Sequence, residues 1–151
     1  MEQRCWFSLT EQPIDPEQLT SLLVNPAAGA CVTFAGWVRN HHSGKVVAAL
    51  TYQVYPELAI KEGERILQEA LANFALCGAV ACHRYGSLQV GDVAVWVGAT
   101  AAHRRAAFQG AMYIIDEIKR RLPIWKKEHY ADGSAIWVNC CSLTTHQQPA
   151  E

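Results

Sequence analysis

Lys119 stands where an amphipathic helix would be expected to carry an apolar side chain. Residues 103–122 have the spacing of such a helix. At 100° per residue, one stripe of it holds Phe108, Met112, Ile115 and Leu122, flanked by Ala111 and Ile118. Lys119 falls near the middle of that stripe, while the outer faces hold Glu117, Arg120 and Arg121. A core-facing ammonium group is costly unless it is paired or opens onto a wet pocket, where it can exchange protons. The alternative is a helix-end lysine whose stem is buried and whose ammonium group reaches water.

Positive charge gathers around this lysine. The segment 104–127 contains seven Lys or Arg residues and two acids, whereas the whole chain has a formal net charge of −1. His103 and Arg104 stand at the expected helix start, where free N–H groups and the helix dipole favour an anion. We therefore expect an anionic small-molecule ligand rather than a nucleic acid.

The other candidate polar residues each have a structural alternative. Arg39, at the end of an expected strand, could be solvated, and His103 could simply begin the helix. Lys126 should share a strand face with Glu128, so the two could form a salt bridge. His83 lies in an apolar strand, which favours a hydrogen-bonded core histidine.

Composition indicates one globular domain. Of the 151 residues, 50% are apolar, and no apolar run reaches the roughly 20 residues that span a bilayer. We expect a single domain over residues 1–143, a polar disordered tail over 144–151, and a cytoplasmic protein, because the start of the chain lacks a signal-peptide pattern. The six cysteines form no CxxC pair and are interpreted as reduced packing residues. Neighbouring loop residues such as His41 and His42 rarely chelate together, so we expect neither a metal nor a cofactor.

The periodicity predicts an α+β fold. Strands are expected over 3–8, 29–39, 46–55, 79–85, 93–101, 124–130 and 135–141, and helices over 15–24, 56–74 and 103–122. The segment 40–45 is expected to be a polar loop, and Gly91-Asp92 and Asp132-Gly133 to be turns. This order of elements is typical of helices packed on a mainly antiparallel sheet.

Taken together and in order, the motifs resemble those of the large, catalytic subunit of molybdopterin synthase. The matching segments are 32–40 (VTFAGWVRN), Tyr55-Pro56, 83–86 (HRYG), Gly91-Asp92, Ala102-His103-Arg104, Lys119 and 123–128 (PIWKKE). The resemblance is collinear over about residues 29–139.

The resemblance implies an α/β hammerhead fold, which is a sheet with packed helices and a small additional β region. It implies a homodimer with a small ubiquitin-like subunit docked at each end, forming a heterotetramer. That subunit would carry a C-terminal Gly-Gly thiocarboxylate as the sulfur donor. The implied reaction is sulfur transfer to cyclic pyranopterin monophosphate, which makes the dithiolene of molybdopterin in molybdenum cofactor biosynthesis.

The resemblance also implies roles for individual residues. The positions that would contact substrate are Trp37, Val38, Arg39, His103, Arg104, Lys119, Lys126, Lys127 and Glu128. Arg39, His103 and Arg104 would hold the cyclic phosphate. Lys119 would sit where the thiocarboxylate tail meets the pterin, and Lys126 would stabilise developing negative charge. Trp37 departs from the family, which often carries a basic or smaller residue there.

Two other functions remain open from the residues. A non-catalytic anion-binding scaffold of the same fold would have no need of a lysine on an apolar stripe. A nucleotide-binding regulatory domain would be expected to carry a Gly-rich phosphate loop, and the sequence contains none of the common types.

Overall fold

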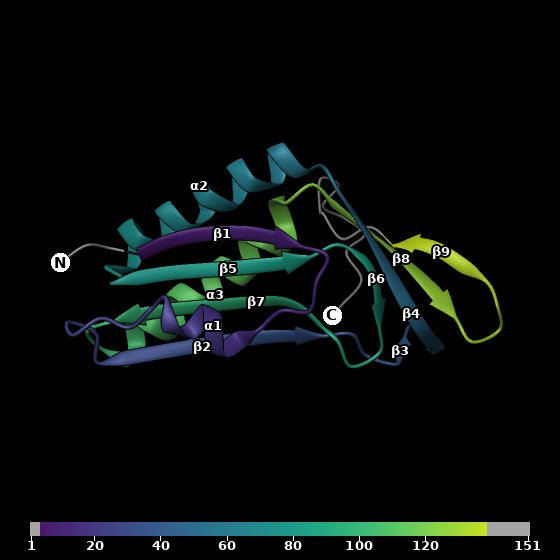
Figure 1. Cartoon of the computed structure of the whole chain (residues 1–151), viewed down its shortest axis with the longest axis horizontal. Coiled ribbons are helices and arrows are strands. Elements are labelled where there is room, and N and C mark those ends of the chain that lie inside the picture. The colour runs from purple at the N-terminus through teal and green to yellow at the C-terminus, as the bar shows by residue number, and fades with distance from the viewer. Residues whose placement is uncertain (1–3, 139–151) are drawn as a thin grey trace.

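The structure, a computed structural model, describes residues 4–138. It contains two sheets, which lie end to end along the molecule (Figure 1). The first sheet has the order β1-β5-β7-β2, from β1 (Arg4–Thr10), β5 (Gly78–Arg84), β7 (Val93–Ala101) and β2 (Ala30–Trp37). β1 and β5 are parallel and the other pairs are antiparallel.

The second sheet has the order β3-β4-β8-β9, and β6 also pairs with β4. Its strands are β3 (His41–His42), β4 (Lys45–Val54), β6 (Gly86–Gln89), β8 (Ile124–Tyr130) and β9 (Ala135–Val138). The pairs of this sheet are all antiparallel. The observed architecture confirms the α+β class and the additional β region.

Three helices complete the described part of the chain: α1 (Pro16–Ser21), α2 (Pro56–Phe74) and α3 (Arg104–Arg121). The side chain of Asp15 caps α1 by accepting hydrogen bonds from the amides of residues 17 and 18. α2 begins with proline at its first turn and ends at Ala75 in the left-handed conformation. Both helix starts agree with the sequence-based prediction.

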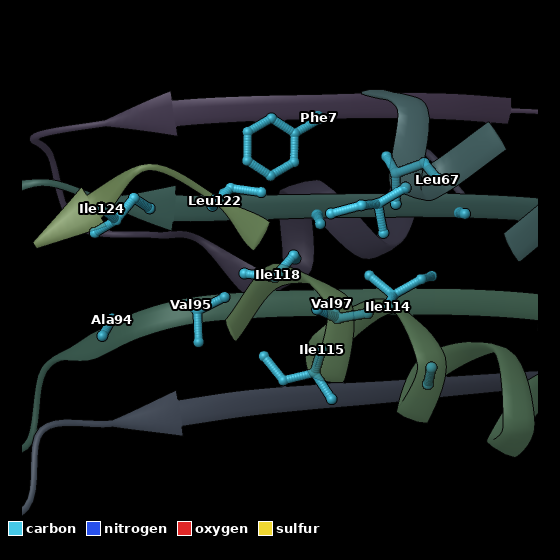
Figure 2. Packing of buried hydrophobic residues seen from close by; sticks show 14 of the residues in the cluster. Phe7, Leu67, Ala94, Val95, Val97, Ile114, Ile115, Ile118, Leu122 and Ile124 are labelled. Carbon is cyan, nitrogen blue, oxygen red and sulfur yellow. The ribbon is translucent and has the colours of Figure 1, made fainter. Parts of the chain in front are cut away.

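The main core lies between the first sheet and the helices α2 and α3. Leu67 of α2 and Ile114 and Ile118 of α3 meet Phe7 and Val97 of the sheet (Figure 2). A smaller cluster on the opposite face joins α1 to the sheet around Trp96. Because both faces are covered, every residue of β5 is buried.

The predicted boundaries hold for most elements, and two features differ. The strand β6 was not predicted, because its four residues are too short for a periodic pattern. The predicted loop 40–45 instead forms the hairpin β3–β4, whose turn residues Ser43 and Gly44 have positive φ. The last residues of the predicted strand 135–141 and the polar tail over 144–151 lie outside the described residues.

The buried face of α3 is rotated from the predicted stripe. Its buried residues are Ala107, Gly110, Ala111, Ile114, Ile115 and Ile118. Ile115 and Leu122 of the predicted stripe are buried, but Phe108 and Met112 are each 61% exposed, so that part of the stripe was wrong. Lys119 is half-buried at the edge of the true core face. The error arose because small residues such as Ala107 and Gly110 form part of the buried face, and a hydrophobicity pattern gives them little weight. A Cβ at Gly110 would meet the side chain of Leu76, so this glycine allows close packing there.

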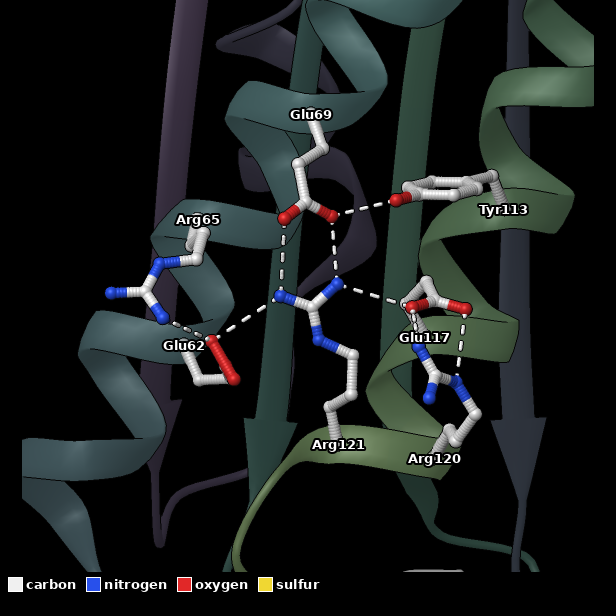
Figure 3. Close-up of polar contacts among 7 residues, drawn as sticks. All are labelled: Glu62, Arg65, Glu69, Tyr113, Glu117, Arg120 and Arg121. Atoms are coloured by element: carbon white, nitrogen blue, oxygen red, sulfur yellow. Dashed lines mark hydrogen bonds and ion pairs between the residues drawn. The ribbon is translucent and has the colours of Figure 1, made fainter.

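A charged cluster joins α2 to α3 (Figure 3). Arg121 bonds to Glu69 at 2.7 Å, Glu117 at 3.1 Å and Glu62 at 3.3 Å. The hydroxyl of Tyr113 also donates to Glu69. The hydrogen bonds from Arg121 and then Tyr113 lower the pKa of the Glu69 carboxyl. The sequence placed Glu117 and Arg121 on solvated faces, but the packing of α2 beside α3 removes both from most of the solvent.

Replacing Arg121 should loosen this helix pair. We expect Arg121→Met to lower the free energy of unfolding by about 1–3 kcal/mol, because it leaves three carboxylates close together without their shared cation. The pKa values of Glu69 and Glu117 both lie below the usual 4.5, so their stabilising effect is present above that pH and lost as pH falls below it. Urea unfolding should show the largest gap between wild type and variant at neutral pH and a narrower gap near pH 3.

The matched control is Arg120→Met, because Arg120 pairs with Glu117 from a far more exposed position. We expect a much smaller loss for this variant. Equal losses for the two variants would contradict the role given to the α2–α3 cluster.

Candidate functional site

A small pocket opens where the two sheets meet. Its walls come from the end of β2, from β4, β7 and β8, and from the last turn of α3. It brings together six of the predicted site residues, namely Trp37, Val38, Arg39, Lys119, Lys126 and Glu128. Tyr52 also lines the pocket and was not predicted as a site residue.

The segment that carries Arg39 is held by the turn at Gly91-Asp92. Val38 donates its amide to the carbonyl of Asp92 and accepts from the amide of Gly91. Gly91 has a φ of +93°, which suits glycine. The Asp92 carboxylate accepts hydrogen bonds from Arg84 and from the amide of Gln89. Arg84 and the Gly91-Asp92 turn therefore position the end of this strand.

β8 delivers two charged side chains to the pocket. Alternate residues of this strand are buried, so Lys126 and Glu128 lie on the same face as Ile124 and Tyr130. Lys126 is 8% exposed and Glu128 is 3% exposed. Lys127 lies on the other face, where its ammonium group is 5.6 Å from the ring of Trp137. The shared face of Lys126 and Glu128 agrees with the prediction, whereas Lys127 is not among the pocket-lining residues.

Glu128 is held by two residues that the sequence-based analysis did not select. His42 Nδ1 lies 2.9 Å from Glu128 Oε1, and the Tyr130 hydroxyl donates to the same oxygen at 2.8 Å. Strand alternation could have placed Tyr130 on the face of Glu128. No local signal could have found His42, because it is 86 positions away in the chain.

His83 is a core histidine, as predicted. Its Nδ1 donates to the carbonyl of Arg84 at 2.7 Å, and its ring meets Tyr52 edge to face. Burial lowers the pKa of His83 from 6.5 to about 4, and the positive charge of Lys119 acts in the same direction. His83 is therefore neutral behind the pocket at physiological pH.

His103 and Arg104 lie away from this pocket within the same protomer. They stand at the start of α3, and Lys119 is near its end. Fifteen residues of helix separate Arg104 from Lys119, which corresponds to about 22 Å. His103 and Arg104 are both exposed, and they line a separate shallow depression with Phe108. His103 is the N-cap residue of α3 by position, but its side chain makes no capping hydrogen bond.

Neither a metal centre nor a membrane-spanning helix is found within residues 4–138. No cluster of three or more His, Cys, Asp or Glu side chains there could hold a metal ion. None of the described helices is long and apolar enough to cross a membrane.

The neutrality of His83 predicts a pH dependence of stability. Between pH 6.5 and about 4 the unfolded chain binds a proton at this residue that the folded chain does not, so the free energy of unfolding falls as pH is lowered through this window. The full effect is up to about 3 kcal/mol. His83→Gln should flatten this part of the profile in urea unfolding at pH 7, 5.5 and 4.5. An NMR titration that gave the His83 imidazole of the folded wild type a midpoint near 6.5 would contradict this prediction.

Comparison with known proteins places this chain in one family. The family described as MoaE protein matches residues 9–121. A molybdopterin synthase catalytic subunit from Pyrococcus abyssi is 41% identical over 133 residues, covering 87% of this chain and 89% of the relative. The solved molybdopterin synthase of Staphylococcus aureus superposes with a TM-score of 0.80 at 33% identity, covering 87% of this chain and 95% of that one.

A more distant structure shows the same fold. It is a complex of subunits 1 and 2 of the molybdopterin-converting factor from Helicobacter pylori, with a TM-score of 0.71 at 19% identity, covering 88% of this chain and 90% of that one. The match to the family over most of the chain, together with relatives near 40% identity, is decisive. The chain therefore belongs to the MoaE protein family, which includes the catalytic subunits of molybdopterin synthase.

Proposed function

We propose that this chain is the catalytic subunit of a molybdopterin synthase. It transfers sulfur from the C-terminal thiocarboxylate of a small ubiquitin-like subunit to cyclic pyranopterin monophosphate, and the product carries the dithiolene of molybdopterin. The observation that carries the proposal is the pocket between the two sheets, where Arg39, Lys119 and Lys126 line one cavity. Three cations in a partly apolar pocket suit an anionic substrate and an anionic sulfur donor.

Each residue of the pocket has a role that fits its position. Arg39, at the exposed rim, binds the cyclic phosphate through charge-assisted hydrogen bonds. Lys126 is buried and stabilises the negative charge that develops as the phosphate ring opens and sulfur adds. Lys119 exchanges protons where the donor tail meets the pterin. When the thiocarboxylate gives up its sulfur, a water molecule supplies the oxygen that replaces it and leaves a carboxylate on the donor tail, so the site must receive one anion and release another.

The assembly that we propose is a homodimer in which each pocket is completed by its partner. His103 and Arg104 belong to the proposed phosphate site, yet α3 separates them from Lys119 by about 22 Å. In a homodimer, a second copy of the chain can bring the start of its own α3, with His103 and Arg104, to the pocket that holds Lys119 of the first copy. The exposed edge strand β2 and the exposed side chains of Phe34, Phe108 and Met112 supply an apolar surface for such a contact.

Strand aromatics that the fold could not cover would also favour a dimer, but most of the candidates do not meet this condition. Trp96 and Tyr52 are buried within the chain, whereas Trp137 is exposed. The case for a dimer therefore rests on β2, α3 and the divided phosphate site.

The small subunit is proposed to dock at each end of the homodimer and give a heterotetramer. The Helicobacter pylori relative with this fold is described as a complex of two subunits of the molybdopterin-converting factor. A Gly-Gly tail without side chains can pass through a narrow channel and bind as an extended strand near Lys119 and Lys126.

Lys119→Ala tests the catalytic assignment. We expect loss of nearly all sulfur transfer, on the order of 100-fold or more, because the variant lacks the proposed proton-transfer group. The fold should survive, since Lys119 lies at the edge of the core face of α3. The assay combines this chain, a thiocarboxylated small subunit and the cyclic precursor, and measures the dithiolene product. Lys61→Ala, on the exposed face of α2, is the matched control. Wild type that binds the precursor without forming product would favour the scaffold alternative.

Mixed dimers test the divided site. The mixed dimer contains one Lys119→Ala chain and one Arg104→Ala chain. If each pocket takes Lys119 from one chain and Arg104 from the other, one pocket has both native residues and the other has lost both. We expect about half of the wild-type activity per dimer, whereas each variant alone should be nearly inactive. Two different affinity tags allow the mixed dimer to be isolated. If the mixed dimer were as inactive as its parents, the phosphate site would lie within one protomer.

A further inference from the structure

The Glu128 carboxylate is an unusual group for a pocket that is proposed to bind anions. Glu128 is 3% exposed and lines the same cavity as Lys119 and Lys126. A buried carboxylate that could rotate freely would change the electric field at both lysines with each rotation. The pocket therefore needs a device that fixes the orientation of this side chain.

His42 and Tyr130 provide two hydrogen bonds to one oxygen of Glu128. The Tyr130 hydroxyl donates to Oε1 at 2.8 Å, and His42 Nδ1 lies 2.9 Å from the same atom. Because a carboxylate oxygen only accepts, Nδ1 must carry the proton in this contact. Neither bond involves Oε2. Lys45 lies over the ring of Tyr130 at 4.8 Å and so packs against one of the two donors.

The hairpin β3–β4 determines which of two adjacent histidines makes this contact. His42 pairs with Lys45 across the turn at Ser43-Gly44, and neighbouring strand residues face opposite sides. The side chain of His42 is 10% exposed and faces Glu128. His41 is exposed, and its Nδ1 lies 3.0 Å from the Asn40 side chain.

The remaining nitrogen of the His42 ring strengthens this interpretation. Nε2 is buried and has no hydrogen-bond partner among the residues that the structure describes. Among the described residues, the hydrogen bond of the His42 ring is therefore the one from Nδ1 to Glu128. An asparagine at this position could place an amide N–H close to where Nδ1 lies, whereas an alanine could not.

We propose that His42 and Tyr130 are positioning residues that lock the Glu128 carboxylate in one orientation beside Lys119 and Lys126, and so set the geometry of the sulfur-transfer site. This inference rests on the proposed function. Neither residue needs to touch the substrate. Their effect passes through Glu128, whose fixed charge orients the cations that receive the precursor and the thiocarboxylate.

The test compares four variants in single-turnover sulfur transfer, with this chain and thiocarboxylated small subunit in excess over the cyclic precursor. When folded chain is present at a saturating excess over the precursor, the single-turnover rate constant does not depend on the fraction of chain that is folded, so partial unfolding of a variant would not change it. We expect His42→Ala to lower the rate constant roughly tenfold, because a small misplacement of a reacting group has effects of this size or larger. His42→Asn should stay within about threefold of wild type, since it keeps the donor to Glu128. Tyr130→Phe should also lower the rate constant while preserving the ring.

His41→Ala is the matched control, because it removes the adjacent exposed imidazole, and we expect it to keep the wild-type rate. Thermal unfolding of each variant checks that the chain remains folded. A wild-type rate in His42→Ala, or equal losses in His42→Ala and His42→Asn, would overturn the positioning role. Absence of transfer by wild type would instead overturn the proposed function, so the two failures are distinguishable.

Discussion

Burial of charge at the junction of the two sheets is the constraint on which the pocket depends. Lys126 and Glu128 occupy a strand face that otherwise belongs to the core, with Ile124 and Tyr130 as neighbours. Removing a carboxylate from water is expensive unless hydrogen bonds replace its hydration. The second sheet supplies these bonds from β3 and β8, through His42 and Tyr130. The small additional β region is therefore part of the site and not an appendage to it.

The first sheet and its helices provide a rigid frame for that junction. The end of β2 is fixed by hydrogen bonds between Val38 and the Gly91-Asp92 turn. The end of α3 is fixed by the Arg121 cluster with α2, close to the turn that carries Lys119 (Figure 3). Groups that must be placed to within a fraction of an ångström are best carried on elements held in this way. The neutral ring of His83 adds support behind the pocket without adding a further positive charge near Lys119.

The length of α3 links the chemistry to the assembly. One helix carries a basic start at Arg104 and a pocket lysine at its other end, so one protomer cannot bring both to the same ligand. The same helix exposes Phe108 and Met112 beside the edge strand β2. A homodimer would cover this apolar surface and join the two ends of the helices in one site. In this proposal, assembly and catalysis depend on the same surface.

The sequence by itself determined the order of the longer strands and helices, the helix starts at Asp15 and Pro56, and the shared face of Lys126 and Glu128, because these follow from local periodicity and capping. The ordered motifs also identified the family, as the comparisons confirm. Only the tertiary structure decided the rotation of α3, since close packing depends on small residues that carry little hydrophobic signal. Only the tertiary structure brought His42 to Glu128 and separated Arg104 from Lys119. Contacts between residues far apart in the chain are set by how sheets and helices pack, and local pattern does not encode them.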